Sequence, residues 1–313
     1  MQHAALIADI GATTTRTALV GANGAYESVV SVSNMEAGDL SDYLAHTLER
    51  ASPRPLRAVL AVAAPVDGEE IVLTNHPWSF ARKPLSEKLG LRELTVVNDF
   101  AAAAYAIPRL RESDTMQIGA GEAGPGATQL ILGPGTGFGV AAVHYADGKA
   151  SVIPSEAGHM RFGATTPEEA AVLDSPSREP GSVTVEHILS GEGIARLHRV
   201  LHGKDARSKQ IIADAAEGLD EERQTISVFL RIFGRIVGDF ALAFDARGGI
   251  FLAGGVVRSL APLIAESPFF ANYREHPPYE GRLDAIPLHL VLHSMPGLLG
   301  AASIAQGASL TPQ

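Results

Sequence analysis

The chain contains no cysteine among its 313 residues. Disulfide frameworks, thiolate zinc sites and cysteine nucleophiles are therefore excluded. Basic residues are outnumbered: there are 25 Lys and Arg against 35 Asp and Glu, and the formal net charge is −10. Because a nucleic-acid-binding protein normally has a basic surplus or a basic stripe, we expect no nucleic-acid partner.

Long apolar runs are also missing. No segment approaches the roughly 18 consecutive apolar residues that indicate a membrane-spanning helix. The N-terminus lacks the basic start and long apolar stretch of a signal peptide. The G-x-x-x-x-G-K-[ST] loop of P-loop nucleotidases and the G-x-S-x-G elbow of α/β-hydrolases are absent as well. We therefore expect a cytoplasmic enzyme or binding protein that has no membrane partner.

The composition is that of a globular protein, with 46% apolar and 19% charged residues. The length suggests about two domains. Short apolar runs separated by Gly- and Asn-containing turns predict consecutive antiparallel strands at residues 6–10, 17–20 and 29–32. The next predicted elements are a helix at 42–51, strands at 56–64 and 94–97, and an alanine-rich helix at 100–107.

A similar order begins again at residues 130–133 and 140–143, where an apolar strand runs into a Gly/Thr turn and returns as a second strand. We interpret this as a weak internal repeat, which predicts two related α/β lobes that each open with a glycine-turn hairpin. A cleft is expected between the lobes. The elements predicted further along are a loop at 175–182, a long helix at 224–244, a strand at 250–253 and a closing helix at 297–307.

The two glycine turns are candidates for holding phosphate, because a backbone without side chains can approach an anion closely and point N–H groups at it. Glycine hairpins are also commonly structural. Asp9 stands at the end of a buried strand, where an unpaired carboxylate is costly. It either caps the turn or holds Mg²⁺ through water.

Asp99 follows a buried strand and opens a helix, which is where open α/β sheets bind ligands. A carboxylate at this place can accept the proton of a substrate hydroxyl that attacks a phosphoryl group. The structural alternative is that Asn98 and Asp99 serve as the N-cap of the following helix.

Glu156 and His159 form a tight polar pair around a glycine. The pair suits a polyol, because a carboxylate and an imidazole can both satisfy adjacent hydroxyls. A solvated loop is one alternative and half of a metal site is another, although no third ligand lies nearby in the sequence. Glu186 is a further acid among apolar residues, and its structural alternative is a helix N-terminal glutamate.

Two histidine pairs are interpreted as structural or surface residues rather than metal ligands. His198 and His202 lie four residues apart on a helical pattern, but the glutamate of the H-E-x-x-H motif is absent. His289 and His293 alternate along a strand pattern.

Seven segments together resemble the bacterial glucokinase family, in the family's order and at its spacing. They are residues 74–80 (TNHPWSF), 97–100 (VNDF), 133–137 (GPGTG), 156–159 (EAGH), 185–191 (VEHILSG), 252–257 (LAGGVV) and 296–300 (PGLLG). The resemblance covers essentially the whole chain. It implies ATP-dependent phosphorylation of the 6-hydroxyl of glucose on a two-lobed actin-like ATPase (ribonuclease H-like) fold. A small α/β lobe would comprise residues 1–109 and 297–313, and a larger α+β lobe residues 110–296.

The resemblance also implies roles for single residues, with ATP and Mg²⁺ as the cofactors. Asp99 would be the general base, and Asp9 would hold Mg²⁺ through water. The residues around the sugar would be Asn75, Asn98, Asp99, Glu156, His159 and Glu186. The residues around ATP would be Asp9, Ile10, Gly11, Ala12, Thr13, Thr14, Gly135, Thr136, Gly137, Gly254 and Gly255.

The first glycine turn departs from the family's Asp-x-Gly-Gly-Thr-Asn pattern at Ala12 and Thr14. This departure favours an alternative, a sugar-binding sensor with little turnover. A kinase for another hexose, such as mannose or an amino sugar, is a second alternative. A nucleotide-binding dehydrogenase is disfavoured, because the turn at Gly133 leads into a strand and the Rossmann fingerprint leads into a helix. A homodimer is expected as the commonest symmetric assembly.

Overall fold

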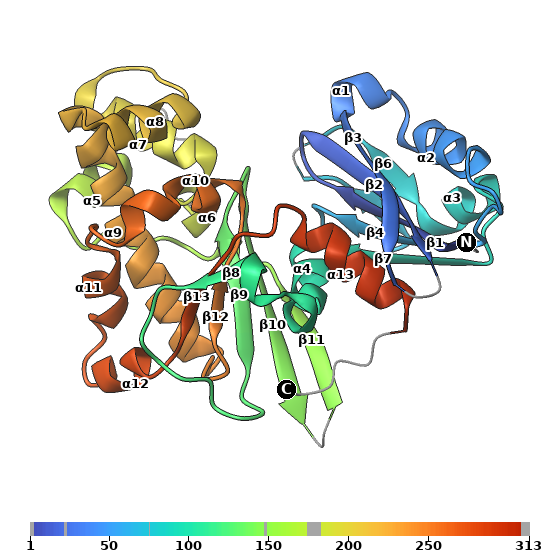
Figure 1. Ribbon diagram of the computed structural model, residues 1–313. Helices are drawn as coiled ribbons and strands as arrows, with labels where there is room; N and C mark the ends of the chain where they lie inside the picture. Colours follow the sequence, from blue (N-terminus) through green and yellow to red (C-terminus); the bar gives the residue numbers. More distant parts are fainter. Residues whose placement is uncertain (1–2, 22–23, 75, 147–148, 174–182, 308–313) are drawn as a thin grey trace. The chain divides into compact units, whose positions relative to one another are not determined.

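The computed structural model describes residues 3–21, 24–74, 76–146, 149–173 and 183–307 (Figure 1). The chain divides into two compact units. Unit 1 consists of Met1–Arg111, Tyr145–Pro154 and His293–Gln313, and unit 2 consists of Glu112–His144 and Ser155–Leu292. Asn75 and the predicted loop at 175–182 lie outside the described residues.

Unit 1 is built on a five-stranded sheet of order β3-β2-β1-β4-β7. The strands β1, β2 and β3 pair antiparallel, whereas β4 and β7 extend the sheet in parallel to β1. Their bounds are His3–Ile10, Thr14–Gly21, Tyr26–Ser33, Arg57–Val62 and Glu93–Asn98. Leu6 and Ile10 of β1 belong to one core and Ile7 to another, so both faces of this strand are buried. A strand that is buried on both faces is a nearly continuous apolar run, and β1 was predicted from the apolar run at residues 6–10.

Helices cover both faces of this sheet. The helices α2 and α3 contribute Leu44, Leu48 and Leu85 to the core on one side. On the other side, α13 contributes Leu298 and several alanines. The bounds of the helices in unit 1 are α1 Asn34–Ala37, α2 Leu40–Glu49, α3 Arg82–Lys88, α4 Asp99–Ala106, a 3-10 turn at Ile107–Arg109 and α13 Pro296–Ala305. A two-stranded sheet of β5 Glu70–Val72 and β6 Ser79–Ala81 completes the unit.

The alanine-rich helix α4 and the closing helix α13 pack backbone to backbone. A Cβ on Gly300 of α13 would overlap the carbonyl oxygen of Ala102 in α4. Only small residues permit helix axes to approach this closely, which explains the run Ala101–Ala104 in α4. On its sheet side, α13 packs Leu298 and Ala302 against Ile7 of β1.

The second large sheet has the order β11-β10-β9-β12-β13-β8. β9 and β10 form an antiparallel hairpin, β12 and β13 run parallel to β9, and β8 is antiparallel to β13. The bounds are β8 Thr115–Gln117, β9 Gln129–Pro134, β10 Phe138–Ala146, β11 Lys149–Ser155, β12 Ile250–Leu252 and β13 Leu288–Val291. The first five positions repeat the strand order of the sheet in unit 1, so the predicted internal repeat is confirmed at the level of topology.

The core of unit 2 is organised by α9, a helix of 24 residues, Asp220–Ala243. Its buried Phe229, Phe233 and Phe240 belong to the core against the second sheet. The other helices are α5 Pro167–Leu173, α6 Val185–Ile188, α7 Gly191–His202, α8 Ser208–Glu217, α10 Gly255–Ile264, α11 Phe269–Arg274 and α12 Glu280–Asp284. Two 3-10 turns lie at Glu112–Asp114 and Ala157–His159.

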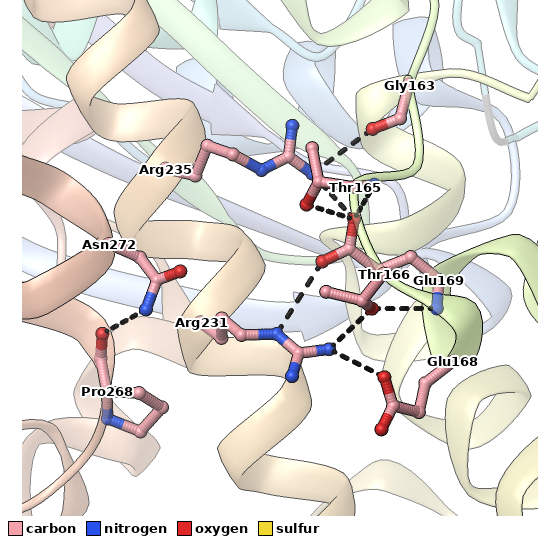
Figure 2. Close-up of polar contacts among 9 residues, drawn as sticks. All are labelled: Gly163, Thr165, Thr166, Glu168, Glu169, Arg231, Arg235, Pro268 and Asn272. Carbon is pink, nitrogen blue, oxygen red and sulfur yellow. Dashed lines mark hydrogen bonds and ion pairs between the residues drawn. The ribbon is translucent and has the colours of Figure 1, made fainter. Parts of the chain in front are cut away.

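A buried carboxylate ties α5 to α9 (Figure 2). Glu169 of α5 is 1% exposed and accepts a hydrogen bond of 2.9 Å from Nη2 of Arg235. Its other oxygen faces Nε of Arg231 at 3.6 Å. The backbone N–H and the hydroxyl of Thr165 also donate to Glu169, at 2.8 and 3.1 Å. Arg231 and Arg235 are four residues apart, so they lie on one face of α9 and hold the same carboxylate.

The predicted strands and helices are confirmed, with shifts at their ends. The helix predicted at 42–51 runs from Leu40 to Glu49, and the one predicted at 224–244 begins at Asp220. Among the described residues, no helix combines the length and the apolar character that crossing a membrane requires.

Candidate active site

The parallel strands of unit 1 end in register at one edge of the sheet. Ile10 of β1 pairs with Val62 of β4, and Val62 pairs with Asn98 of β7. Neighbouring strands are roughly 4.8 Å apart, so the ends of β1 and β7 lie on the order of 10 Å from each other. Asp9 and Asp99 therefore lie on the same edge of this sheet, the edge at which α/β proteins bind ligands.

Asp9 is held between a cation and a helix start. Nη1 of Arg16 lies 3.8 Å from its Oδ2. A Cβ placed on Gly297, in the first turn of α13, would lie 3.1 Å from its Oδ1. Burial raises the pKa of the Asp9 carboxyl, and the positive charge of Arg16 opposes that shift. The N-terminus of α13 favours the ionised form as well, because unpaired N–H groups give a helix start a partial positive charge.

The turn between β1 and β2 is fixed by Asn34, a buried residue that the sequence analysis missed. Its Nδ2 donates to the carbonyl oxygen of Gly11 at 2.8 Å, and its backbone N–H donates to that of Thr13 at 3.0 Å. Its Oδ1 accepts from the hydroxyl of Thr15 at 2.9 Å. Asn34 therefore holds the turn through the carbonyl groups of Gly11 and Thr13.

Asn98 and Asp99 share the start of α4. The Asn98 side chain accepts from the N–H groups of Phe100 and Ala101 at 2.9 and 3.1 Å, so the predicted capping role is confirmed for this residue. Oδ1 of Asp99 accepts from the N–H of Phe100 at 2.8 Å. Asp99 is partly exposed at the end of β7. The capping role of Asn98 thus leaves Asp99 at the carboxyl edge of the sheet.

In unit 2, two helix starts converge on the turn between β9 and β10. The N–H of Gly191, the first residue of α7, donates to the carbonyl oxygen of Gly135 at 3.0 Å. Gly254, the N-cap of α10, has a φ of 122°, and a Cβ there would overlap the carbonyl oxygen of Pro134. Helix N-termini and glycine turns are anion-binding elements, so this corner of unit 2 suits the phosphates of a nucleotide.

The three predicted sugar ligands of unit 2 gather around Phe138. Oε2 of Glu186 accepts from the Phe138 N–H at 2.8 Å. A Cβ on Gly158 would overlap the Phe138 carbonyl oxygen, so the turn that carries Glu156 and His159 packs against the same residue. Nε2 of His159 lies 4.0 Å from Oε2 of Glu156, and both side chains are about half exposed.

A family model for glucokinase matches residues 6–308. The chain belongs to the glucokinase family. A glucokinase of Mesorhizobium japonicum is 35% identical over 315 residues, which cover 97% of this chain and 92% of that protein.

Solved structures agree on the fold. The crystal structure of a glucokinase from an Antarctic psychrotroph matches with a TM-score of 0.81 at 31% identity, over 97% of this chain and 99% of that one. A glucokinase of Balamuthia mandrillaris in complex with glucose matches with a TM-score of 0.81 at 21% identity, over 96% of this chain and 93% of that one. The predicted two-lobed actin-like ATPase fold is confirmed.

Membership of the glucokinase family also confirms the predicted enzyme class, an ATP-dependent kinase of glucose. The geometry gives such an enzyme two groups of residues, one within each unit. Unit 1 presents carboxylates at the ends of parallel strands, and unit 2 presents an anion-binding corner beside a polar cluster suited to hydroxyls.

Proposed function

We propose that Asp99 is the general base with which this member of the glucokinase family phosphorylates the 6-hydroxyl of glucose. The observation that carries the proposal is the position of Asp99 at the end of β7, in the first turn of α4. There its carboxylate accepts the proton of the attacking hydroxyl as the oxygen–phosphorus bond forms. In phosphoryl transfer the protein mainly positions the reactants and stabilises charge, and a base that orients the hydroxyl is one of the recurring parts.

We assign the other hydroxyls of the sugar to Asn75, Asn98, Glu156, His159 and Glu186. The contact of Glu186 Oε2 with the Phe138 N–H supports this assignment, because it fixes the position of the carboxylate. Carboxylates accept hydrogen bonds from hydroxyls, and the imidazole of His159 can donate or accept. An epimer of glucose leaves one of these groups unpaired, which is the basis for discrimination among hexoses.

We assign the phosphates of ATP to the two glycine turns. Gly135, Thr136 and Gly137 form the turn at which α7 and α10 begin, and its glycines let the backbone approach negative charge closely. We assign Gly254 and Gly255, at the start of α10, to the adenosine side of ATP.

In unit 1, the turn formed by Ile10, Gly11, Ala12, Thr13 and Thr14 takes part from the end of β1. Asp9 at the start of this turn fits Mg²⁺, because the ion prefers carboxylate and water oxygens. The Asp9 side chain is 16% exposed, and Nη1 of Arg16 stays 3.8 Å from its Oδ2, beyond hydrogen-bond distance. When bound, Mg²⁺ neutralises charge on the phosphates.

We further propose the setting of the enzyme. The two lobes of the family are residues 1–109 with 297–313, and residues 110–296; units 1 and 2 follow this division except that unit 1 also takes in Tyr145–Pro154 and a few residues at each boundary. The enzyme acts in the cytoplasm, where its substrate ATP is available, and forms a homodimer, the commonest symmetric assembly of soluble proteins. Light scattering on the eluting protein tests the dimer directly, because a mass of 32.8 kDa identifies the monomer.

The role of Asp99 is tested by ATP-dependent phosphorylation across glucose, mannose and an amino sugar, with Mg²⁺ present. Replacing Asp99→Asn is expected to lower kcat by about 10²–10⁴-fold, the usual contribution of a general base. Glucose should still raise the melting temperature of the variant. The control is Asp67→Asn at an exposed position of unit 1.

Near-normal turnover of Asp99→Asn would contradict the general-base role. Glucose binding without turnover in the unaltered chain would instead favour the sugar sensor suggested by Ala12 and Thr14.

A further inference from the structure

A buried histidine of α7 meets two consecutive glutamates of α9, away from the residues assigned to the substrates. The side chain of His198 is 1% exposed. Ligand atoms of His198, Glu221 and Glu222 all lie within 4.8 Å of one another. Nε2 of His198 is 3.8 Å from Oε1 of Glu222 and makes no hydrogen bond within the described part of the chain.

The hydrogen bonds of Thr225 determine which nitrogen of His198 carries its proton. The Thr225 hydroxyl donates its single proton to the carbonyl oxygen of Glu221 at 3.0 Å. It can therefore only accept from the two imidazoles that contact it, Nδ1 of His198 at 3.0 Å and Nε2 of His202 at 3.2 Å. A neutral His198 thus has its proton on Nδ1 and a lone pair on Nε2.

This arrangement places a lone pair opposite a carboxylate. The Nε2 lone pair of His198 faces Glu222, and the Glu221 carboxylate lies beside them. Acceptors that face one another repel unless a positive species stands between them, and the repulsion is strongest where water is excluded. Here His198 is 1% exposed and Glu222 16%, whereas Glu221 is 43% exposed. Lys204 contacts Glu221 from the exposed side, with Nζ 2.6 Å from Oε2, and its charge also acts on Glu222 and His198 from a greater distance. Among the described residues no hydrogen bond or ion pair joins Lys204 to either of these two side chains.

We propose that His198, Glu221 and Glu222 bind one divalent transition-metal ion of the Zn²⁺ type. One imidazole and two carboxylates are ordinary ligands of such ions, at about 2.0–2.2 Å from the metal. The separation of 3.8 Å between Nε2 and Oε1 fits two ligands of one ion. Thr225 is then a positioning residue, because it accepts the Nδ1 proton of the ligating histidine, as outer-shell groups of metal-bound histidines do.

The ion would join the C-terminal half of α7 to the first turn of α9. The chain between these helices includes α8 and the residues around it, so the ion would close a loop of the fold rather than take part in phosphoryl transfer. Its expected effect is a stabilisation of the native state that grows with the logarithm of the metal concentration divided by the Kd.

The experiment is a titration of the metal-free full chain with Zn²⁺, in competition with a chromophoric chelator, and with Co²⁺, followed by visible absorption. The chain has no cysteine, so no thiolate contributes to either signal. We expect one equivalent to bind and Zn²⁺ to raise the melting temperature. Glu222→Gln should abolish both effects, and Thr225→Val should weaken binding about 10–100-fold. Glu217→Gln, an exposed change on α8, should leave binding unchanged.

Absence of stoichiometric binding of both Zn²⁺ and Co²⁺ would overturn the proposal. So would binding that persists unchanged in Glu222→Gln, since the ion would then lie elsewhere, for instance at Glu156 and His159. A nitrogen-15 spectrum that shows both ring nitrogens of His198 protonated at neutral pH, with metal present, would also overturn it. In that case a proton, and not a metal ion, stands between His198 and Glu222.

Discussion

Replacing Glu169→Gln keeps the shape of the side chain and removes its charge from between Arg231 and Arg235. The side chains of Arg231 and Arg235 are only 24% and 19% exposed, so water compensates their charges poorly. Removing one partner of a buried ion pair costs about 3–5 kcal/mol, because the remaining charge stays buried. Arg231 keeps a contact with Glu168 at 3.4 Å, which places the expected loss at the lower end, about 3 kcal/mol.

The assay is equilibrium urea unfolding of the two forms under the same conditions, with activity as a check that the native state is retained. Glu168→Gln is the matched control, since Glu168 contacts the same Arg231 but is 43% exposed. Water screens an exposed ion pair, so this control should change the free energy of unfolding little. If both variants lost the same amount, or if Glu169→Gln lost less than 1 kcal/mol, the reasoning from burial would be wrong.

Three further changes follow from the fold. Gly254→Ala should raise the KM for ATP at least about 10-fold in initial-rate assays. The reason is that a Cβ at Gly254 would overlap the carbonyl oxygen of Pro134 and displace the start of α10. Gly281→Ala is the control, because a Cβ at Gly281 meets open space and should leave this KM unchanged. Asp39→Ala should lower the free energy of unfolding by about 1 kcal/mol at pH 7, since Asp39 caps α2. Hydrogen bonding to Ser41 lowers the pKa of Asp39, so this stabilisation is present above the ordinary pKa of 3.8 and is lost as the pH falls through the lowered pKa of the folded state. The difference in free energy of unfolding between the unaltered chain and Asp39→Ala should therefore be larger at pH 7 than at pH 3. Gly300→Ala should cost about 1–3 kcal/mol in urea unfolding through overpacking of α13 on α4, and an unchanged midpoint would contradict that packing.

Apolar runs and apolar periodicity in the sequence predicted most of the strands and helices. The strands β1 and β4 are nearly continuous apolar runs, because helices bury both faces of their part of the sheet. The strand β7 was also predicted to be buried, but only its Val96 is. The start of α9 was predicted four residues late. Asp220, Glu221 and Glu222 suit the positive end of a helix, but they interrupt the apolar periodicity on which the prediction depended.

Some of the polar residues that matter to the site and the fold could be identified from the sequence, and others could not. Asp9 and Asp99 could be found from the sequence, since each stands where a buried strand meets a turn or a helix. Asn34 and Glu169 could not, because their partners are distant in the chain. Asn34 contacts residues 19 and 23 positions away, and Glu169 pairs with Arg235, 66 positions away. A single polar residue carries no local signal for such a contact.

The position of α13 has a consequence for synthesis of the chain. The face of the unit 1 sheet that carries Ile7 is covered by residues 296–305, and about 190 residues separate this segment from the end of α4. At about 5–20 residues per second, a ribosome needs roughly 10–40 s to add them. Through that interval the nascent sheet exposes an apolar face, which is a binding surface for chaperones and a route to aggregation. Unit 1, first to leave the ribosome, is therefore the last to be completed.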